Sequence, residues 1–205
     1  MTIEHDADTT CLGRAELGAV EQDLIRKSWT HYETVDVEAR MVKIATTRPI
    51  ARCIYLGRLD RARMLLADLE RFDVSPFSTH LRLGPAGVSV CFSPVLETSG
   101  ETLLVVDGMH RIVAAMEAGL SSIVGLVVRA AHLPPPTIAP CTWDEVERVG
   151  KKRTRAEKFP GYDPDLFRTT GKYLDNLSGP YDSAGAALEA VKQAQSSNVF
   201  LRRAL

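Results

Sequence analysis

The sequence predicts an α/β (α+β-like) domain in which a small mixed sheet is flanked by helices. Two continuous apolar runs, over 102–106 and 123–128, are typical of strands buried on both faces, and a short helical pattern separates them. The chain has 205 residues, of which 45% are hydrophobic and 25% charged, which is ordinary for a globular protein. We therefore expect one core with appended segments.

The chain divides into three parts. Residues 1–34 contain a polar tail and an amphipathic helix over 15–32. Residues 35–134 form the core, which ends at three consecutive prolines. Residues 135–205 form a mostly helical C-terminal appendage that packs on the core.

The first half of the core contains several short periodic stretches. Asp60 is a plausible N-cap for one of them, and Pro94 interrupts another, which points to a sheet edge or a bulge. These stretches predict, in chain order, strands over 40–46 and 51–56, a helix over 60–72 and a strand over 88–96.

The second half of the core reads as strand, tight turn, helix and strand. A helix is expected over 110–118, with Gly119 at the position of a C-terminal glycine cap. The flanking apolar strands, over 102–106 and 123–128, would then form a parallel pair with a right-handed connection.

The appendage begins with a capping box, over 142–145, which predicts the start of a helix. The basic run over 151–155 would then lie late in that helix, where the dipole favours cations. A polyphosphate or nucleic acid contact is the alternative for this run. A last helix is expected over 183–195.

Charge and cysteine usage exclude several classes of protein. The formal net charge is −1, which argues against nucleic acid as a partner. The four cysteines are widely spaced, which favours buried free thiols over a zinc site or disulfides. No leader pattern or apolar run of membrane length, about 18 residues, is present, so we expect a cytoplasmic protein without a membrane partner.

The segment from Asp107 to Arg111 carries the strongest functional signal. A strand ends there, a glycine-containing turn follows, and a helix begins, which is a typical arrangement for binding phosphate. Gly108 permits a positive φ, and Arg111 adds a permanent, bidentate charge. His110 is able to donate a hydrogen bond or to titrate. Asp107 would repel a bare phosphate, but it would bind a metal, a hydroxyl or the arginine.

The alternative is purely structural. Asp-Gly is a common turn sequence, and Asp107 could simply cap the following helix. His110 and Arg111 would then be surface residues. The physics of this segment alone leaves both interpretations open.

A family resemblance favours the functional interpretation. The stretch over 104–128, LVVDGMHRIVAAMEAGLSSIVGLVV, resembles the signature of the ParB/sulfiredoxin superfamily. The matching positions are Asp107, Gly108, His110, Arg111, Ala114, Ala115 and Gly119, followed by the apolar strand. The resemblance covers about 25 residues and implies a ParB/sulfiredoxin-like core with a nucleotide phosphate at residues 108–111. Within the superfamily, the motif is most similar to those of free-serine kinases and of ParB-like antibiotic-pathway regulators.

The sequence also departs from the members of this superfamily. Met109 stands in place of the sulfiredoxin cysteine, which excludes that chemistry. The serine kinases have a glutamate base after their first strand, where this chain has none, and Glu97 and Glu38 are candidate substitutes. Arg48, near the first strands, is a further candidate for phosphate binding. No helix-turn-helix pattern follows residue 134.

These observations predict a nucleotide-dependent phosphotransferase that acts on the hydroxyl of a small molecule, with a free amino acid as one acceptor class. Asp107, His110 and Glu97 are the catalytic candidates, and Asp107 is also the candidate ligand for Mg²⁺. ATP or another nucleotide would bind through Gly108, Met109, His110, Arg111 and Arg48. The alternative is a non-catalytic ParB-like nucleotide-binding or regulatory protein, and a homodimer is left open.

Overall fold

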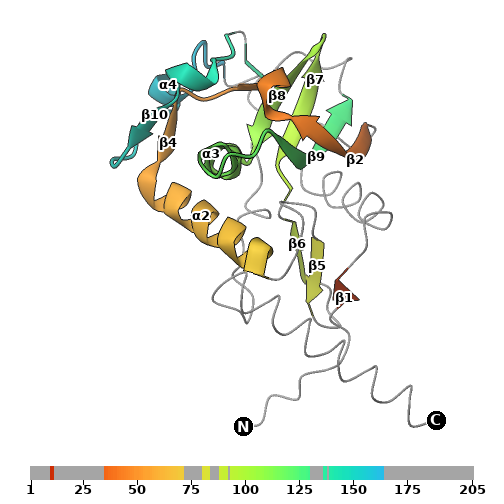
Figure 1. The fold of residues 1–205 in the computed structure, drawn as a ribbon. Helices are drawn as coiled ribbons and strands as arrows, with labels where there is room; N and C mark the ends of the chain where they lie inside the picture. Colours follow the sequence, from red (N-terminus) through yellow and green to blue (C-terminus); the bar gives the residue numbers. More distant parts are fainter. Residues whose placement is uncertain are drawn as a thin grey trace, which may run out of the picture.

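The computed structural model (Figure 1) describes residues 10–11, 35–71, 80–83, 88–91, 93–129, 136–137 and 139–163. The expected helices over 15–32 and 183–195 lie outside the described residues, as does most of the appendage.

The core is a mixed five-stranded sheet with the strand order β2-β9-β7-β8-β3. The strands are β2 (Asp36–Lys43), β3 (Thr47–Pro49), β7 (Val95–Ser99), β8 (Thr102–Asp107) and β9 (Ser122–Arg129). A tight turn at Gly100 joins β7 and β8 into an antiparallel hairpin. The central β7 is parallel to β9, β3 is parallel to β8, and β2 is antiparallel to β9.

Two helices lie on the same side of this sheet (Figure 1). They are α2 (Leu56–Arg71) and α3 (Met109–Glu117). The main core forms where Leu96, Val105 and Val127 from three adjacent strands meet Ile112 of α3 and Leu59 of α2. These side chains are almost completely buried, so the hydrophobic effect fixes α3 against the sheet.

Two smaller sheets complete the described part. One contains β1 (Thr10–Cys11), β5 (His80–Leu83) and β6 (Val88–Cys91). The other pairs β4 (Cys53–Tyr55) in parallel with β10 (Glu147–Val149). After β10 the chain reaches the single-turn helix α4 (Arg155–Lys158), and the backbone N–H of Arg52 donates to the Lys158 carbonyl at 2.7 Å. This hydrogen bond holds α4 beside β4.

The predicted fold class, a small mixed sheet flanked by helices, is confirmed. The expected helix over 110–118 is α3, and Gly119 has the positive φ (77°) of a helix-terminating glycine. Cys53 and Cys141 are buried free thiols, as expected, and burial raises the pKa of both.

Three predicted boundaries were wrong. The first strand of the core is β2, which ends at Lys43 and not at residue 46, and a single 3₁₀ turn (Ile44–Thr46) follows it. Helix α2 begins at Leu56, so Asp60 lies inside the helix and pairs with Arg63 instead of capping. The expected strand over 88–96 is two strands in different sheets, because the chain changes sheet before Pro94.

The expected parallel pair of apolar strands was also wrong. β7 lies between β8 and β9, and it is antiparallel to the first and parallel to the second. β8 and β9 therefore run in opposite directions, and α3 crosses over β7 between them. Figure 1 shows α3 nearly end-on while the strands run within the plane, which is consistent with a helix that runs across the sheet.

The capping box over 142–145 is present, but the helix it starts is only one 3₁₀ turn (Trp143–Glu145). The chain then extends into β10, because pairing with β4 supplies backbone hydrogen bonds that a longer helix would have to replace. Residues 151–153 consequently lie between β10 and α4 and not in a helix, which corrects the expected position of the basic run.

Candidate functional site

The Asp-Gly turn lies where the sequence predicts, at the end of β8 and the start of α3. Gly108 is the N-cap of α3 and has φ 89° and ψ 16°, in the left-handed region that favours glycine. A Cβ at this position would lie 2.8 Å from Cα and Cβ of Pro94. The glycine is thus required both by its backbone conformation and by the close approach of Pro94, which fills the space beside its Cα.

Asp107 and Arg111 form an ion pair at this turn. The Nη2 of Arg111 donates to Oδ2 of Asp107 at 2.5 Å. The Arg111 side chain is 11% exposed and the Asp107 side chain 23% exposed, so the pair is largely shielded from water. Asp107 is the last residue of β8 and Arg111 lies in the first turn of α3, so the turn at Gly108 brings the two side chains together.

The contact bears on the structural alternative. Gly108, the N-cap residue, has no side chain that could cap α3, and the Asp107 carboxylate accepts a hydrogen bond from the Arg111 side chain. The first four backbone N–H groups of any helix have no acceptor within it, and the helix dipole adds a partial positive charge there. The start of α3 therefore has the properties of an anion site, with a cation and a carboxylate beside it.

His110 is held by the neighbouring strand β4. Its Nε2 accepts a hydrogen bond from the backbone N–H of Tyr55 at 3.0 Å. The two rings stack, with centroids 6.3 Å apart and planes inclined by 23°. Because Nε2 is an acceptor here, the proton of the neutral imidazole resides on Nδ1. His110 thereby connects the turn to β4.

Met109, another candidate for phosphate binding, has its side chain in the hydrophobic core. It is 7% exposed, so only its backbone is placed to meet a ligand at the helix start. The buried side chain anchors the first turn of α3 to the sheet.

Glu97 lies on the opposite side of the sheet from α3. It pairs with Leu104 of β8 and Val128 of β9, whereas Leu96, the residue before it, faces α3. Successive side chains of a strand point to opposite faces, so Glu97 and Asp107 are not brought together. Glu97 is 1% exposed, within the sheet.

Arg48 is exposed on the edge strand β3, next to Leu104. Its charge, together with that of Arg52, helps to lower the pKa of Glu145, after the hydrogen bonds from Thr142. The environment of Arg48 is therefore the Trp143–Glu145 turn. The structure therefore does not bring Arg48 together with residues 108–111 as the sequence predicts.

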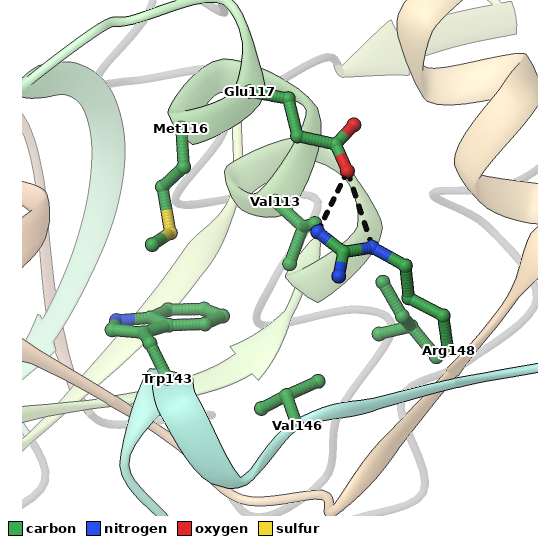
Figure 2. A pocket seen from close by; sticks show the side chains of 7 residues that line it. Val113, Met116, Glu117, Trp143, Val146 and Arg148 are labelled. Carbon is green, nitrogen blue, oxygen red and sulfur yellow. Dashed lines mark hydrogen bonds and ion pairs between the residues drawn. The ribbon is translucent and has the colours of Figure 1, made fainter.

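A small cavity lies beside the later turns of α3 (Figure 2). Its volume is about 70 Å³, far below the roughly 300 Å³ at which pockets begin to enclose a drug-sized ligand. Met116 and Trp143 face each other across it, and an ion pair between Arg148 and Glu117 (2.8 Å) lies at one side. The cavity is too small for a nucleotide and is separate from the Gly108 turn.

The structure allows a limited test of the expected Mg²⁺ site. Within the described ranges, no three histidine, cysteine or acidic side chains gather into a metal-binding group. Asp107 supplies one carboxylate at the turn. Mg²⁺ is commonly held by one or two carboxylates together with phosphate oxygens, so Asp107 fits a nucleotide-bound magnesium ion but not a metal caged by protein alone.

Two residues at the site were not identified from the sequence. Tyr55 is 55 residues away from His110 along the chain, and no local pattern signals their contact. Pro94 was noted only as an interruption of a strand. A proline before a strand, combined with a distant glycine at a helix start, signals a close backbone approach only once the pairing of β7 and β8 is known.

No protein-family model, curated protein or solved structure matches this chain. The resemblance of residues 104–128 to the ParB/sulfiredoxin superfamily stays a prediction. No helix among the described residues is both long and apolar enough to cross a membrane.

Proposed function

We propose that this protein binds the phosphates of a nucleotide, as its Mg²⁺ complex, at the N-terminus of α3. We further propose that it transfers a phosphoryl group to the hydroxyl of a small molecule, with free amino acids as the first acceptor class to test. ATP, or another nucleotide, would be the donor.

The observation that carries this proposal is the arrangement of Gly108, Asp107 and Arg111. The N-cap residue is a glycine, which has no capping side chain, and a shielded guanidinium and a carboxylate lie beside it. An anion bound there would receive backbone N–H groups, the helix dipole and one permanent cation together. In the absence of ligand, Asp107 neutralises that cation.

Binding would exchange the partners of the ion pair. Arg111 would turn from the Asp107 carboxylate to a phosphate oxygen, and Asp107 would hold Mg²⁺ or accept the proton of the acceptor hydroxyl. Bound Mg²⁺ supplies charge neutralisation for the transferred phosphoryl group. His110 would keep the turn in place through its hydrogen bond with Tyr55.

A second candidate function is the same binding without catalysis. The position of Glu97 favours it, because this carboxylate is on the far side of the sheet from Asp107. Asp107 would then be the only carboxylate of the predicted catalytic set at the turn. A nucleotide-binding regulatory protein needs no general base.

Calorimetric titration with ATP, ADP, CTP and GTP, each with Mg²⁺, tests binding directly. Arg111→Ala should weaken the binding of whichever nucleotide binds by about 1.5–3 kcal/mol, the range for charge-assisted hydrogen bonds. Arg129→Ala is the matched control, because Arg129 also pairs with a carboxylate, that of Glu38, but lies at the end of β9.

The double variant Asp107→Asn, Arg111→Gln removes both charges and leaves a polar amide at each position, and so serves if Arg111→Ala does not fold. It should also bind nucleotide weakly. Nucleotide affinity equal to that of the wild type in either folded variant would refute the proposed site. Transfer is then assayed with an acceptor screen, and firm binding without transfer would select the second candidate.

A further inference from the structure

A basic segment lies next to the candidate site, although it is distant in sequence. Between residues 151 and 158 there are five cations and one carboxylate, that of Glu157. The cations are Lys151, Lys152, Arg153, Arg155 and Lys158, of which all but the half-buried Lys158 are exposed. This segment is a concentrated positive patch on a protein whose formal net charge is −1.

Tyr55 joins this segment to the turn. Its hydroxyl accepts a hydrogen bond from the backbone N–H of Arg153 at 3.3 Å, and the ammonium of Lys158 lies 5.2 Å from the centre of its ring. The same ring stacks on His110, and the Tyr55 backbone N–H donates to that imidazole. One residue therefore separates the basic segment from the first turn of α3.

The charges of the segment also reach β4. Burial raises the pKa of the Cys53 thiol, and the charges of Lys158 and Arg153 act against that rise. The single carboxylate of the segment is largely occupied, because Glu157 accepts hydrogen bonds from the backbone N–H (2.8 Å) and hydroxyl (2.7 Å) of Thr154. Its approach to the Arg153 guanidinium is longer, at 3.8 Å, and both side chains are about half exposed.

The position of the segment is fixed by its own contacts. Thr154 and Glu157 form a capping box at the start of α4, and the Lys158 carbonyl accepts from Arg52 beside β4. The cations are thus displayed from an anchored backbone next to the site, which lowers the entropy lost when they bind a ligand.

We propose that residues 151–158 form the second half of the phosphate-binding surface. One phosphate of the ligand lies at the α3 turn, and the basic segment binds the phosphates that extend from it. The ligand class is therefore a nucleoside diphosphate or triphosphate, and the segment discriminates against monophosphates. This inference rests on the proposed function.

The first test compares AMP, ADP and ATP by calorimetry with the wild-type chain. Affinity should rise from AMP to ATP by at least about tenfold, because each additional charge-assisted contact contributes roughly that factor or more. Equal affinity for the three nucleotides would overturn this inference and leave the proposed function intact. Absence of binding to these three nucleotides and to CTP and GTP would instead remove the proposed function, and this inference with it.

The second test uses the double variant Lys152→Gln, Arg153→Gln. It should lose about tenfold or more in ATP affinity and keep its AMP affinity, since the α3 turn is unchanged. Arg40→Gln, Lys43→Gln on strand β2 is the matched control with the same change of charge, and should bind ATP as the wild type does. Equal loss for AMP and ATP, or the same loss in the control, would overturn the inference.

Tyr55→Phe supplies an independent variant, because it removes only the hydroxyl that accepts from Arg153. It should reduce ATP affinity and leave AMP affinity unchanged. A single-stranded oligonucleotide tests the alternative ligand. If the chain binds it in a salt-sensitive way, and Lys152→Gln, Arg153→Gln abolishes this binding without any effect on ATP affinity, the segment binds nucleic acid and our assignment is refuted.

Discussion

Replacing Asp107 with asparagine separates the ion-pair role of this residue from a capping role. The change keeps the shape of the side chain but removes the charge that faces Arg111, 2.5 Å away. The Arg111 guanidinium is only 11% exposed, so water replaces little of the lost attraction. In the variant the charged guanidinium faces a neutral amide in place of a carboxylate. A hydrogen bond to a charged group contributes about 1.5–3 kcal/mol and a neutral one about 0.5–1.5 kcal/mol, so removing one of the two charges should cost about 1–2 kcal/mol of stability.

Urea unfolding measures this loss. For a slope of about 2 kcal/mol/M, the midpoint should fall by roughly 0.5–1 M. Asp144→Asn is the control, because Asp144 is exposed on the 3₁₀ turn after Thr142, and it should leave the midpoint unchanged.

Calorimetry without Mg²⁺ should show that Asp107→Asn binds nucleotide at least as tightly as the wild type, because Asp107 no longer competes for Arg111.

Phosphoryl transfer by the variant should fall by about a hundredfold or more, the usual scale for loss of a general base. If Asp107 only capped α3, asparagine would replace it at almost no cost, because the two residues cap helices about equally well. An unchanged urea midpoint would therefore refute the ion-pair reasoning. Weaker nucleotide binding without Mg²⁺ would refute the exchange of partners at Arg111.

Three further predictions follow from other contacts. Gly108→Ala should destabilise the fold by about 2–4 kcal/mol in urea unfolding, since a Cβ there meets a left-handed backbone and Pro94; a loss under 1 kcal/mol would contradict this. Hydrogen bonds from Arg63 and Arg148 lower the pKa of Glu117 below its ordinary value of 4.5. The ionised Glu117 therefore stabilises the folded protein fully above pH 4.5, and this stabilisation is lost as pH falls through the lowered pKa. Glu117→Gln should thus lower the free energy of unfolding by about 1 kcal/mol at pH 7 and leave it unchanged at pH 2. A difference between variant and wild type that is the same at both pH values would contradict this prediction. Duplex DNA should give no mobility shift at physiological salt, and a salt-sensitive shift would show this expectation to be wrong.

The elements of the core followed from local pattern, but their order in the sheet did not. The apolar runs that predict β8 and β9 are evident in the sequence, whereas the insertion of β7 between them depends on contacts across the sheet. One signal was present. Gly125 lies within the second run, and in the structure a Cβ there would lie 2.7 Å from Leu96 of β7. A glycine inside a buried strand indicates such a close neighbour without naming it.

The candidate site was predictable where its residues are consecutive. Asp107, Gly108 and Arg111 lie within five consecutive residues. The end of a strand, the glycine and the start of a helix could therefore be recognised together in the sequence. The contribution of Tyr55 was not predictable, because only the tertiary fold brings β4 into contact with α3. The side of the sheet that Glu97 faces depends on the register of its strand, because a shift of one residue would turn its side chain to the other face.

The strand order also bears on how this chain folds. Hairpin β7–β8, helix α3 and strand β9 are continuous in sequence, over 95–129, and carry the Asp107–Arg111 turn within local contacts. Both edges of the sheet come from earlier in the chain: Glu38 of β2 meets Arg129 across 91 residues. Closing such loops is slow. We expect the site-bearing segment to be structured in the folding transition state and the edge strands β2 and β3 to dock afterwards. Mutations in α3 would then slow folding, while mutations in β2 would mainly accelerate unfolding.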